Sequence, residues 1–112
     1  MQRDQILAMD PGRELDELIH KYVLKADYPF ELAYQRGETR WSQDIAFAWE
    51  VVEKIHADGE YNLALEWYPQ EKEWGADFDE WGVTSQCCAK TAPLAICRAA
   101  LLAVIEEVPN ET

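Results

Sequence analysis

One segment constrains the fold of this chain more than any other. Residues 91–108 are predicted to form a helix, because Thr91 is a good N-cap and Pro109 cannot continue it. A helix that is apolar on nearly every side is stable in water only when other elements pack around it. We therefore expect it at the centre of the core, with Arg98 and the Glu106–Glu107 end facing water. The apolar residues around its circumference are Leu94, Ile96, Cys97, Leu101, Leu102, Val104 and Ile105.

The length of 112 residues and the apolar content of 48 % favour a single domain spanning residues 1–112. No run approaches the roughly 18 consecutive apolar residues of a membrane span, so we expect no membrane partner. The first four residues also lack the apolar core of a secretory signal. An odd cysteine count that includes the adjacent pair Cys87 and Cys88 is a poor disulfide framework, so a cytoplasmic location is expected.

The net charge is −12, from 10 basic and 22 acidic residues. Such acidity excludes a simple nucleic-acid binder, because contact with phosphates needs clustered Lys and Arg. Five Trp, five Tyr and three Phe exclude a disordered acidic tail, which would carry few aromatic residues. The composition indicates a folded domain that does not bind nucleic acid directly.

Two further helices are predicted upstream, with a weaker helical turn over residues 4–9. The first begins with Asp10 as N-cap and Pro11 at the first helical position. The second begins at Ser42 and stops at Gly59. Each carries an apolar stripe at helical spacing. The stripes are Leu15, Leu18, Ile19, Tyr22 and Val23 in the first helix, and Ile45, Ala48, Trp49, Val52 and Ile55 in the second.

Between residues 61 and 90 the hydrophobic period changes from 3.6 to 2. Alternating patterns over 61–67 and 74–79 predict two half-buried strands joined by a turn at 69–72, and 83–90 fits a third strand. Short connections make this an antiparallel meander. The chain is thus predicted to be an α+β protein of order α-α-β-β-β-α, with a three-stranded antiparallel β-meander and three helices. A homo-oligomer is expected, because it would protect the sheet edges.

Three segments resemble the phage ABA sandwich domain family of small phage and prophage proteins. They are residues 9–16 (MDPGRELD), 41–52 (WSQDIAFAWEVV) and 91–103 (TAPLAICRAALLA). The resemblance implies helices packed on a sheet in an α/β/α sandwich-like arrangement, and it implies no activity or site residues. A sandwich would have helices on both sheet faces. The polar positions of the strand pattern instead predict one solvated sheet face. This face is either partly covered or meets a partner. The polar positions are Asn62, Glu66, Asp77 and Asp79.

Residues 25–41 fit no regular element but are rich in aromatic side chains and arginine. Aromatic faces stack on nucleobases, and arginine binds phosphate through two parallel hydrogen bonds. The segment also leads into a helix N-terminus, which favours anions. These features predict a site for a small anionic, nucleotide-like ligand; the alternative is that the aromatics cover the core. The candidate ligand-binding residues are Tyr28, Tyr34, Arg36, Arg40, Trp41 and Ser42.

Residues 66–80 hold six acids and one base, Lys72, interleaved with aromatic residues. Such a surface could dock a basic host protein or imitate the charge of DNA, with electrostatic attraction accelerating the encounter. The alternative is an ordinary solvated face that keeps the protein soluble. The candidate partner-binding residues are Glu66, Asp77, Asp79 and Glu80.

No catalytic motif accompanies the two histidines, His20 and His56, which lie on different helices. Cys97 lies on an apolar helix and is expected to behave as a small hydrophobic residue. A small enzyme is the remaining alternative, but we expect no catalytic residues, no metal and no cofactor. The favoured hypothesis is a non-catalytic phage or prophage accessory protein that binds a host-derived target, with a role in counter-defence.

Overall fold

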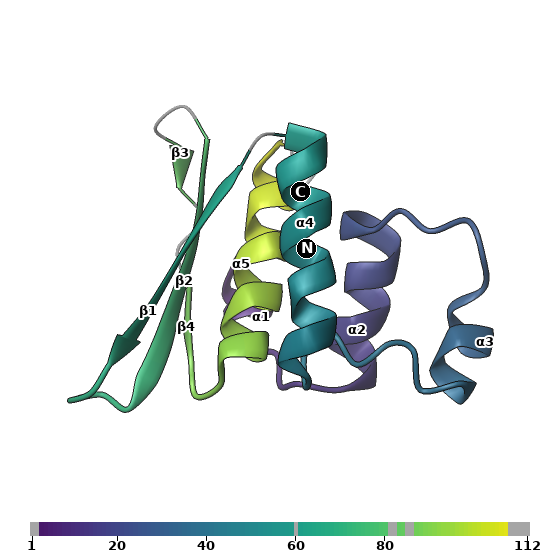
Figure 1. Ribbon diagram of the computed structural model, residues 1–112, viewed down its shortest axis with the longest axis horizontal. Helices are drawn as coiled ribbons and strands as arrows, with labels where there is room; N and C mark the ends of the chain where they lie inside the picture. Colours follow the sequence, from purple (N-terminus) through teal and green to yellow (C-terminus); the bar gives the residue numbers. More distant parts are fainter. Residues whose placement is uncertain (1–2, 60, 81–82, 85–86, 108–112) are drawn as a thin grey trace.

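The computed structural model describes residues 3–59, 61–80, 83–84 and 87–107, and it has the predicted α+β fold (Figure 1). Its helical elements are α1 (Arg3–Leu7), α2 (Arg13–Leu18), the π-helical turn η1 (Ile19–Val23), α3 (Phe30–Gln35), α4 (Ile45–Gly59) and α5 (Ala92–Glu107). Its strands are β1 (Asn62–Tyr68), β2 (Glu73–Glu80), β3 (Val83–Thr84) and β4 (Cys87–Ala89).

The sheet is the predicted antiparallel meander with β2 at its centre. β1 pairs with β2 without interruption, from Asn62 opposite Asp79 to Tyr68 opposite Glu73. β3 and β4 both lie along the other edge of β2, where Thr84 faces Asp79 and Cys87 faces Ala76. The two pairs are separated by three residues along β2 and by three residues along the chain from Thr84 to Cys87. β3 and β4 therefore pair with β2 in the same register. They correspond to the single third strand that was predicted over 83–90.

The predicted central position of the last helix is confirmed. α5 packs on β2 and β4 on one side, and α1, α4 and η1 pack on its other sides. Every residue from Leu94 to Leu102 is buried except Arg98. The Thr91 hydroxyl accepts a hydrogen bond from the Leu94 N–H at 3.4 Å, which confirms the predicted cap. The predicted end at residues 108–109 lies outside the described residues.

In Figure 1 the described helices all lie on one side of the sheet. The other face carries the exposed side chains of Asn62 and Glu66 and the half-buried Asp77, so the predicted solvated face is present. No helix from the described residues covers it, so the second helical layer of a sandwich is not found there. The side chains of Asp79 and Glu80 lie outside the described part of the structure.

Both upstream helices begin later than predicted, α2 by two residues and α4 by three. α2 starts at Arg13 and has Gly12, not Asp10, at its N-cap, with φ of 146°, a region that only glycine enters readily. α4 starts at Ile45, where the Asp44 carboxylate accepts the Ala46 N–H at 2.9 Å. Ser42 does not cap α4, because its polar atoms are occupied by contacts with the N-terminal end of α2.

The first helix also differs from its predicted stripe in its second half. Leu15, Ile19 and Val23 are buried as expected, but Tyr22 is 38 % exposed and His20 is buried. The reason is the π-helical turn, in which the Leu24 N–H donates to the Ile19 carbonyl, five residues back. This wider turn changes the angular spacing of the side chains and breaks the 3.6-residue period.

The prediction that residues 25–41 lack regular structure was wrong, because Phe30–Gln35 form α3. Pro29 does not break this helix, since it occupies the N-cap with an extended backbone. Gly37 ends the helix with φ of 73°. The Gly37 N–H donates to the Tyr34 carbonyl and the Glu38 N–H to the Ala33 carbonyl, both at 3.0 Å. These bonds form a Schellman motif, which satisfies the last carbonyls of α3.

Candidate functional site

Two polar side chains connect the start of α2 to the segment before α4. Asp16 is 2 % exposed and Ser42 is fully buried. The Ser42 N–H donates to Asp16 Oδ1 at 2.8 Å, and the Ser42 hydroxyl oxygen accepts the Gly12 N–H at 2.9 Å. Burial raises the pKa of Asp16 above its usual value, and the hydrogen bonds to Ser42 and the charge of Arg40 offset part of that rise. The contact fixes α2 relative to the chain from residue 36 to residue 43.

A cleft of about 410 Å³ opens beside this contact, and we call it the arginine pocket. Arg13 and Asp16 come from α2, Tyr34 and Gln35 from α3, and the rest from the connection to α4. Two arginines therefore line one cleft in a chain whose net charge is −12. The complete lining is Arg13, Asp16, Tyr34, Gln35, Gly37, Thr39, Arg40 and Gln43.

Arg13 is held in place by α3. Its guanidinium carbon lies 4.6 Å from the centre of the Tyr34 ring and 5.8 Å from that of Phe30. The rings of Phe30 and Tyr34 are themselves stacked at 5.7 Å, and Arg13 forms an ion pair with Glu31. The cation–π contacts orient the guanidinium without consuming its N–H donors, whereas the ion pair with Glu31 occupies Nη2. Arg13 is thus held by Tyr34, Phe30 and Glu31 within the lining of the pocket before any ligand binds.

The six predicted ligand-binding residues do not all reach this pocket. Tyr34 and Arg40 line it. Trp41 and Ser42 are buried, and Trp41 Nε1 donates to Glu50 Oε1 at 3.3 Å. The remaining two, Tyr28 and Arg36, are exposed and lie outside the pocket lining.

Sequence reasoning missed Arg13, Asp16 and Thr39. Arg13 and Asp16 are three positions apart on the polar side of a helix, a spacing that most solvated helix faces share. Only the packing of α2 against α3 and the 36–43 segment brings them into a cleft. Thr39 is 2 % exposed. Nothing in the sequence pointed to it as a site residue except its position next to Arg40.

An aromatic cluster adjoins the pocket through Phe30, which is stacked on Tyr34. The ring of His20 is 5.0 Å from Tyr28, 5.6 Å from Phe30 and 6.3 Å from Trp41, measured between ring centres. His20 is buried, and its Nε2 atom has no hydrogen-bond partner among the residues that the structure describes. The other histidine is structural, since His56 Nδ1 donates to the Tyr61 carbonyl oxygen at 2.9 Å where α4 leads into β1.

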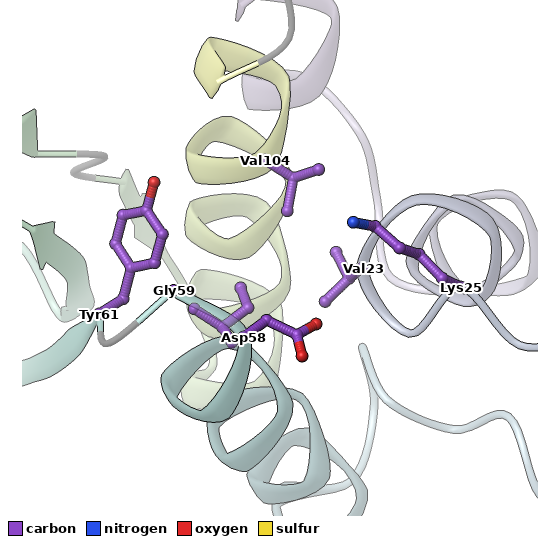
Figure 2. Close-up of a pocket in the computed structure, with 7 residues that line it drawn as sticks. Val23, Lys25, Asp58, Gly59, Tyr61 and Val104 are labelled. Carbon is purple, nitrogen blue, oxygen red and sulfur yellow. The ribbon is translucent and has the colours of Figure 1, made fainter.

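A smaller cavity of about 100 Å³ lies between the end of η1, the end of α4 and α5 (Figure 2). Lys25 and Asp58 approach it from different elements, and Val23 and Val104 supply apolar walls. Its volume is well below the 300–1,000 Å³ of ordinary ligand pockets, so a nucleotide does not fit there. A third hollow of about 550 Å³ follows one stretch of chain, residues 8–14.

On the solvated sheet face the acidic side chains are partly engaged. The Tyr68 hydroxyl donates to Glu66 Oε1 at 3.2 Å, and Lys90 pairs with Glu73 at 3.9 Å. The Tyr68 ring also lies over Gly75, where a Cβ atom would overlap it. Within the residues that the structure describes, no three His, Cys, Asp or Glu side chains are grouped as metal ligands. Within the same residues, no helix has the length and apolar character needed to cross a membrane.

Comparison with known proteins places this architecture in a phage family. The model of the phage ABA sandwich domain matches residues 6–101. A 2.0 Å crystal structure of a phage protein from Bacillus cereus ATCC 14579 is 29 % identical and has a TM-score of 0.68, covering 87 % of this chain and 94 % of that chain. No curated protein matches. The match contains every residue of the arginine pocket and α5 as far as Leu101, and the chain therefore belongs to the phage ABA sandwich domain family.

Proposed function

We propose that this chain is a non-catalytic phage accessory protein that binds a small anionic, nucleotide-like ligand of the host in the arginine pocket. The observation that carries the proposal is the convergence of Arg13 and Arg40 on one cleft. In a chain with 22 acidic and 10 basic residues, a cleft with two arginines is a local reversal of charge. Guanidinium groups bind phosphate through two parallel hydrogen bonds, which favours phosphate over a simple halide.

The form of the cleft supports the same ligand class. Its volume of about 410 Å³ lies within the range of small-molecule sites. Tyr34 is 41 % exposed, and its ring, which already carries the Arg13 guanidinium and is stacked on Phe30, adds apolar surface beside the arginines that a sugar or base can contact. The side-chain amides of Gln35 and Gln43 supply hydrogen-bond donors and acceptors for a polar ring edge. Sequestering such a ligand is the chemistry that a counter-defence protein of this kind would use.

The test is a thermal-shift screen of mononucleotides and cyclic nucleotides, followed by calorimetry. We expect at least one ligand to raise Tm, and Arg13→Ala and Arg40→Ala each to abolish the rise. Arg36→Ala is the matched control, because it removes the same charge from an exposed arginine outside the pocket lining. Loss of binding in the control as well would indicate attraction by overall charge only. A flat response to every nucleotide would contradict the proposal.

A second candidate is supported by the solvated sheet face. Glu66 and Asp77 lie on neighbouring strands of that face, and no described helix covers them. A basic host protein could dock there, or the face could imitate the charge of DNA. Glu66→Lys combined with Asp77→Lys should abolish capture of such a partner at low salt, whereas Arg13→Ala should not. Capture that is insensitive to both salt and charge reversal would exclude this candidate.

A further inference from the structure

The edge strand β1 lacks the features that usually prevent an edge strand from pairing with another strand. Its seven residues pair in continuous register with β2, so no bulge interrupts the strand. Among the described strands, only β2 pairs with it, and its outer edge presents backbone N–H and C=O groups to solvent. Natural edge strands usually carry Lys, Pro, a bulge or several charges that prevent further pairing. Between Asn62 and Tyr68 there is one charge, Glu66, and no Lys or Pro.

The two faces of β1 differ in polarity. The row on the helix side consists of Leu63, Leu65 and Trp67, and none of the three is fully buried, with Trp67 44 % exposed. The row on the solvated side begins with the exposed Asn62, Ala64 and Glu66. A strand added to this edge would therefore cover apolar surface on one face only. It would also need an apolar row on that same face.

We propose that β1 pairs with β1 of a second copy of this chain, antiparallel and about a two-fold axis at Leu65. The axis is perpendicular to the sheet, so the helices of both copies lie on the same side and the two sheets become continuous. Residues that face each other in an antiparallel pair lie on the same face of the sheet. Under this condition the axis passes beside one residue of β1 and not between two residues. The residues near the middle of the strand, Ala64, Leu65 and Glu66, are the candidates.

The side chains of β1 select Leu65 among these three. With the axis there, all seven residues pair, Leu65 meets its own symmetry mate, and Leu63 faces the partner's Trp67. On the solvated face Glu66 lies opposite the partner's Ala64, so the only charge in the strand has no like charge directly across from it. An axis at Glu66 would place two carboxylates opposite each other, which destabilises a strand pair. An axis at Ala64 would leave Trp67 and Tyr68 beyond the paired segment.

A second copy is the occupant that this pattern specifies. In this register an identical strand supplies the matching apolar row on the helix side, and it places no like charges directly opposite each other on the solvated side. The net charge of −12 per chain opposes association weakly, because charges farther apart than the Debye length of about 8 Å are screened at physiological salt. Edge pairing of this kind is an isologous, closed contact.

Sedimentation equilibrium and light scattering on the full chain test the proposal. We expect a dimer of about twice the 12.9 kDa chain mass. Ala64→Glu places a carboxylate opposite the partner's Glu66 at two symmetric positions and should raise the dimer Kd by about 2- to 30-fold. Ala64→Lys should lower it by a similar factor. Ala64 is exposed, so both variants should fold, which circular dichroism verifies.

Controls separate the interface from the general effect of charge. Gln70→Glu and Gln70→Lys make the same charge changes in the exposed hairpin turn, outside β1, and should leave Kd unchanged. The double variant Ala64→Glu/Glu66→Lys restores opposite charges across the interface and should recover the dimer, although Ala64 also faces Asp77 within the same chain. Hydrogen exchange of β1 should slow as the protein concentration increases.

Three results would overturn the proposal. The first is a monomer at every soluble concentration. The second is a dimer whose Kd does not respond to the Ala64 and Glu66 variants, which would place the contact elsewhere. The third is protection of β1 that requires addition of a host extract, which would assign the edge to a strand of another protein. None of these outcomes depends on the arginine pocket, so this inference and the proposed function can fail separately.

Discussion

Asp16 accepts the backbone N–H of Ser42 at 2.8 Å, with both residues buried. The two residues are 26 positions apart, and their contact holds α2 against the connection that leads into α4. The arginine pocket lies directly on this contact, since Asp16 forms part of its lining. The geometry of the candidate site is therefore set by one buried hydrogen-bonded pair, and the first two predictions concern that pair.

Ser42→Ala should destabilise the protein by about 1–3 kcal/mol, because the partly buried Gly12 N–H loses its acceptor and Asp16 loses a hydrogen bond. Urea denaturation followed by tryptophan fluorescence measures the change. Gln43→Ala is the control, since its side chain is exposed one position along the chain. Equal stabilities for wild type and Ser42→Ala would show that water replaces these bonds without cost.

Asp16→Asn should change the pH dependence of stability in a defined direction. Burial raises the pKa of Asp16 in the folded state above its ordinary value of 3.8. In the interval between these two pKa values the folded state binds more protons than the unfolded state, so the contribution of Asp16 to stability falls as pH rises through it. The unfolding free energy of wild type minus that of Asp16→Asn should therefore decrease from acidic to neutral pH. Denaturation at several pH values measures it, and a difference that increases would contradict the assignment.

Arg98→Ala should cost about 1.5–3 kcal/mol, although the residue was expected to face water. Its Nε atom donates to the Met9 carbonyl oxygen at 3.0 Å, a second guanidinium N–H reaches the same oxygen, and the Nη1 atom donates to the Cys88 carbonyl at 3.3 Å. One side chain on α5 thus connects the N-terminal segment to β4. Thermal and urea denaturation measure the loss.

Lys54→Ala is a suitable comparison for Arg98→Ala. Lys54 forms an exposed ion pair with Asp58 one turn later on α4, at 3.4 Å, and such pairs contribute only about 0.3–0.5 kcal/mol. If both substitutions cost the same small amount, Arg98 is a solvated residue as the sequence suggested, and its contacts contribute nothing measurable.

The cysteines should differ sharply in reactivity with a thiol reagent. The Cys88 side chain is exposed, whereas Cys87 and Cys97 are buried. Desolvation raises the pKa of Cys97 well above its usual value, and Asp16 adds to the effect. In the folded protein only Cys88 should react on the timescale of minutes, and the other two should react after unfolding. Labelling followed by mass spectrometry of peptides measures the order.

Cys88 itself should react more slowly than an unperturbed thiol. Its pKa is raised by partial desolvation and then by the charges of Glu73 and Glu71. Glu73→Gln should therefore accelerate labelling at neutral pH, and Glu53→Gln on α4 should not. Rapid modification of Cys97 in the folded state would contradict the placement of α5 at the centre of the core.

The regular elements with strong hydrophobic periods could be predicted from the sequence. The distribution of apolar residues in α5 and their alternation in β1 and β2 depend only on which faces of these elements are buried. The spacing of apolar residues in the sequence is enough to show those faces. The boundaries were less accessible. Ser42 and Asp10 both have the chemistry of an N-cap, but Asp44 and Gly12 have that role. Which residue caps the helix depends on the tertiary structure, because the Ser42 hydroxyl bonds to Gly12 in a distant part of the chain and not to the start of α4. α3 was missed because Pro29 and Gly37 are read as breakers, when one is its N-cap and the other its terminator.

By itself, the sequence determined the α+β class, the central helix, the solvated acidic sheet face and the concentration of aromatic and arginine residues in the 28–41 segment. Only the tertiary structure decided which of those residues face a cleft. It buried Trp41 and Ser42, and it brought Arg13 and Asp16 to Tyr34 and Arg40. It also joined Arg98 to Met9, 89 positions away. The physical reason is that periodicity reports the apolar face of each element. A polar site depends on where elements from distant parts of the chain come to rest against one another.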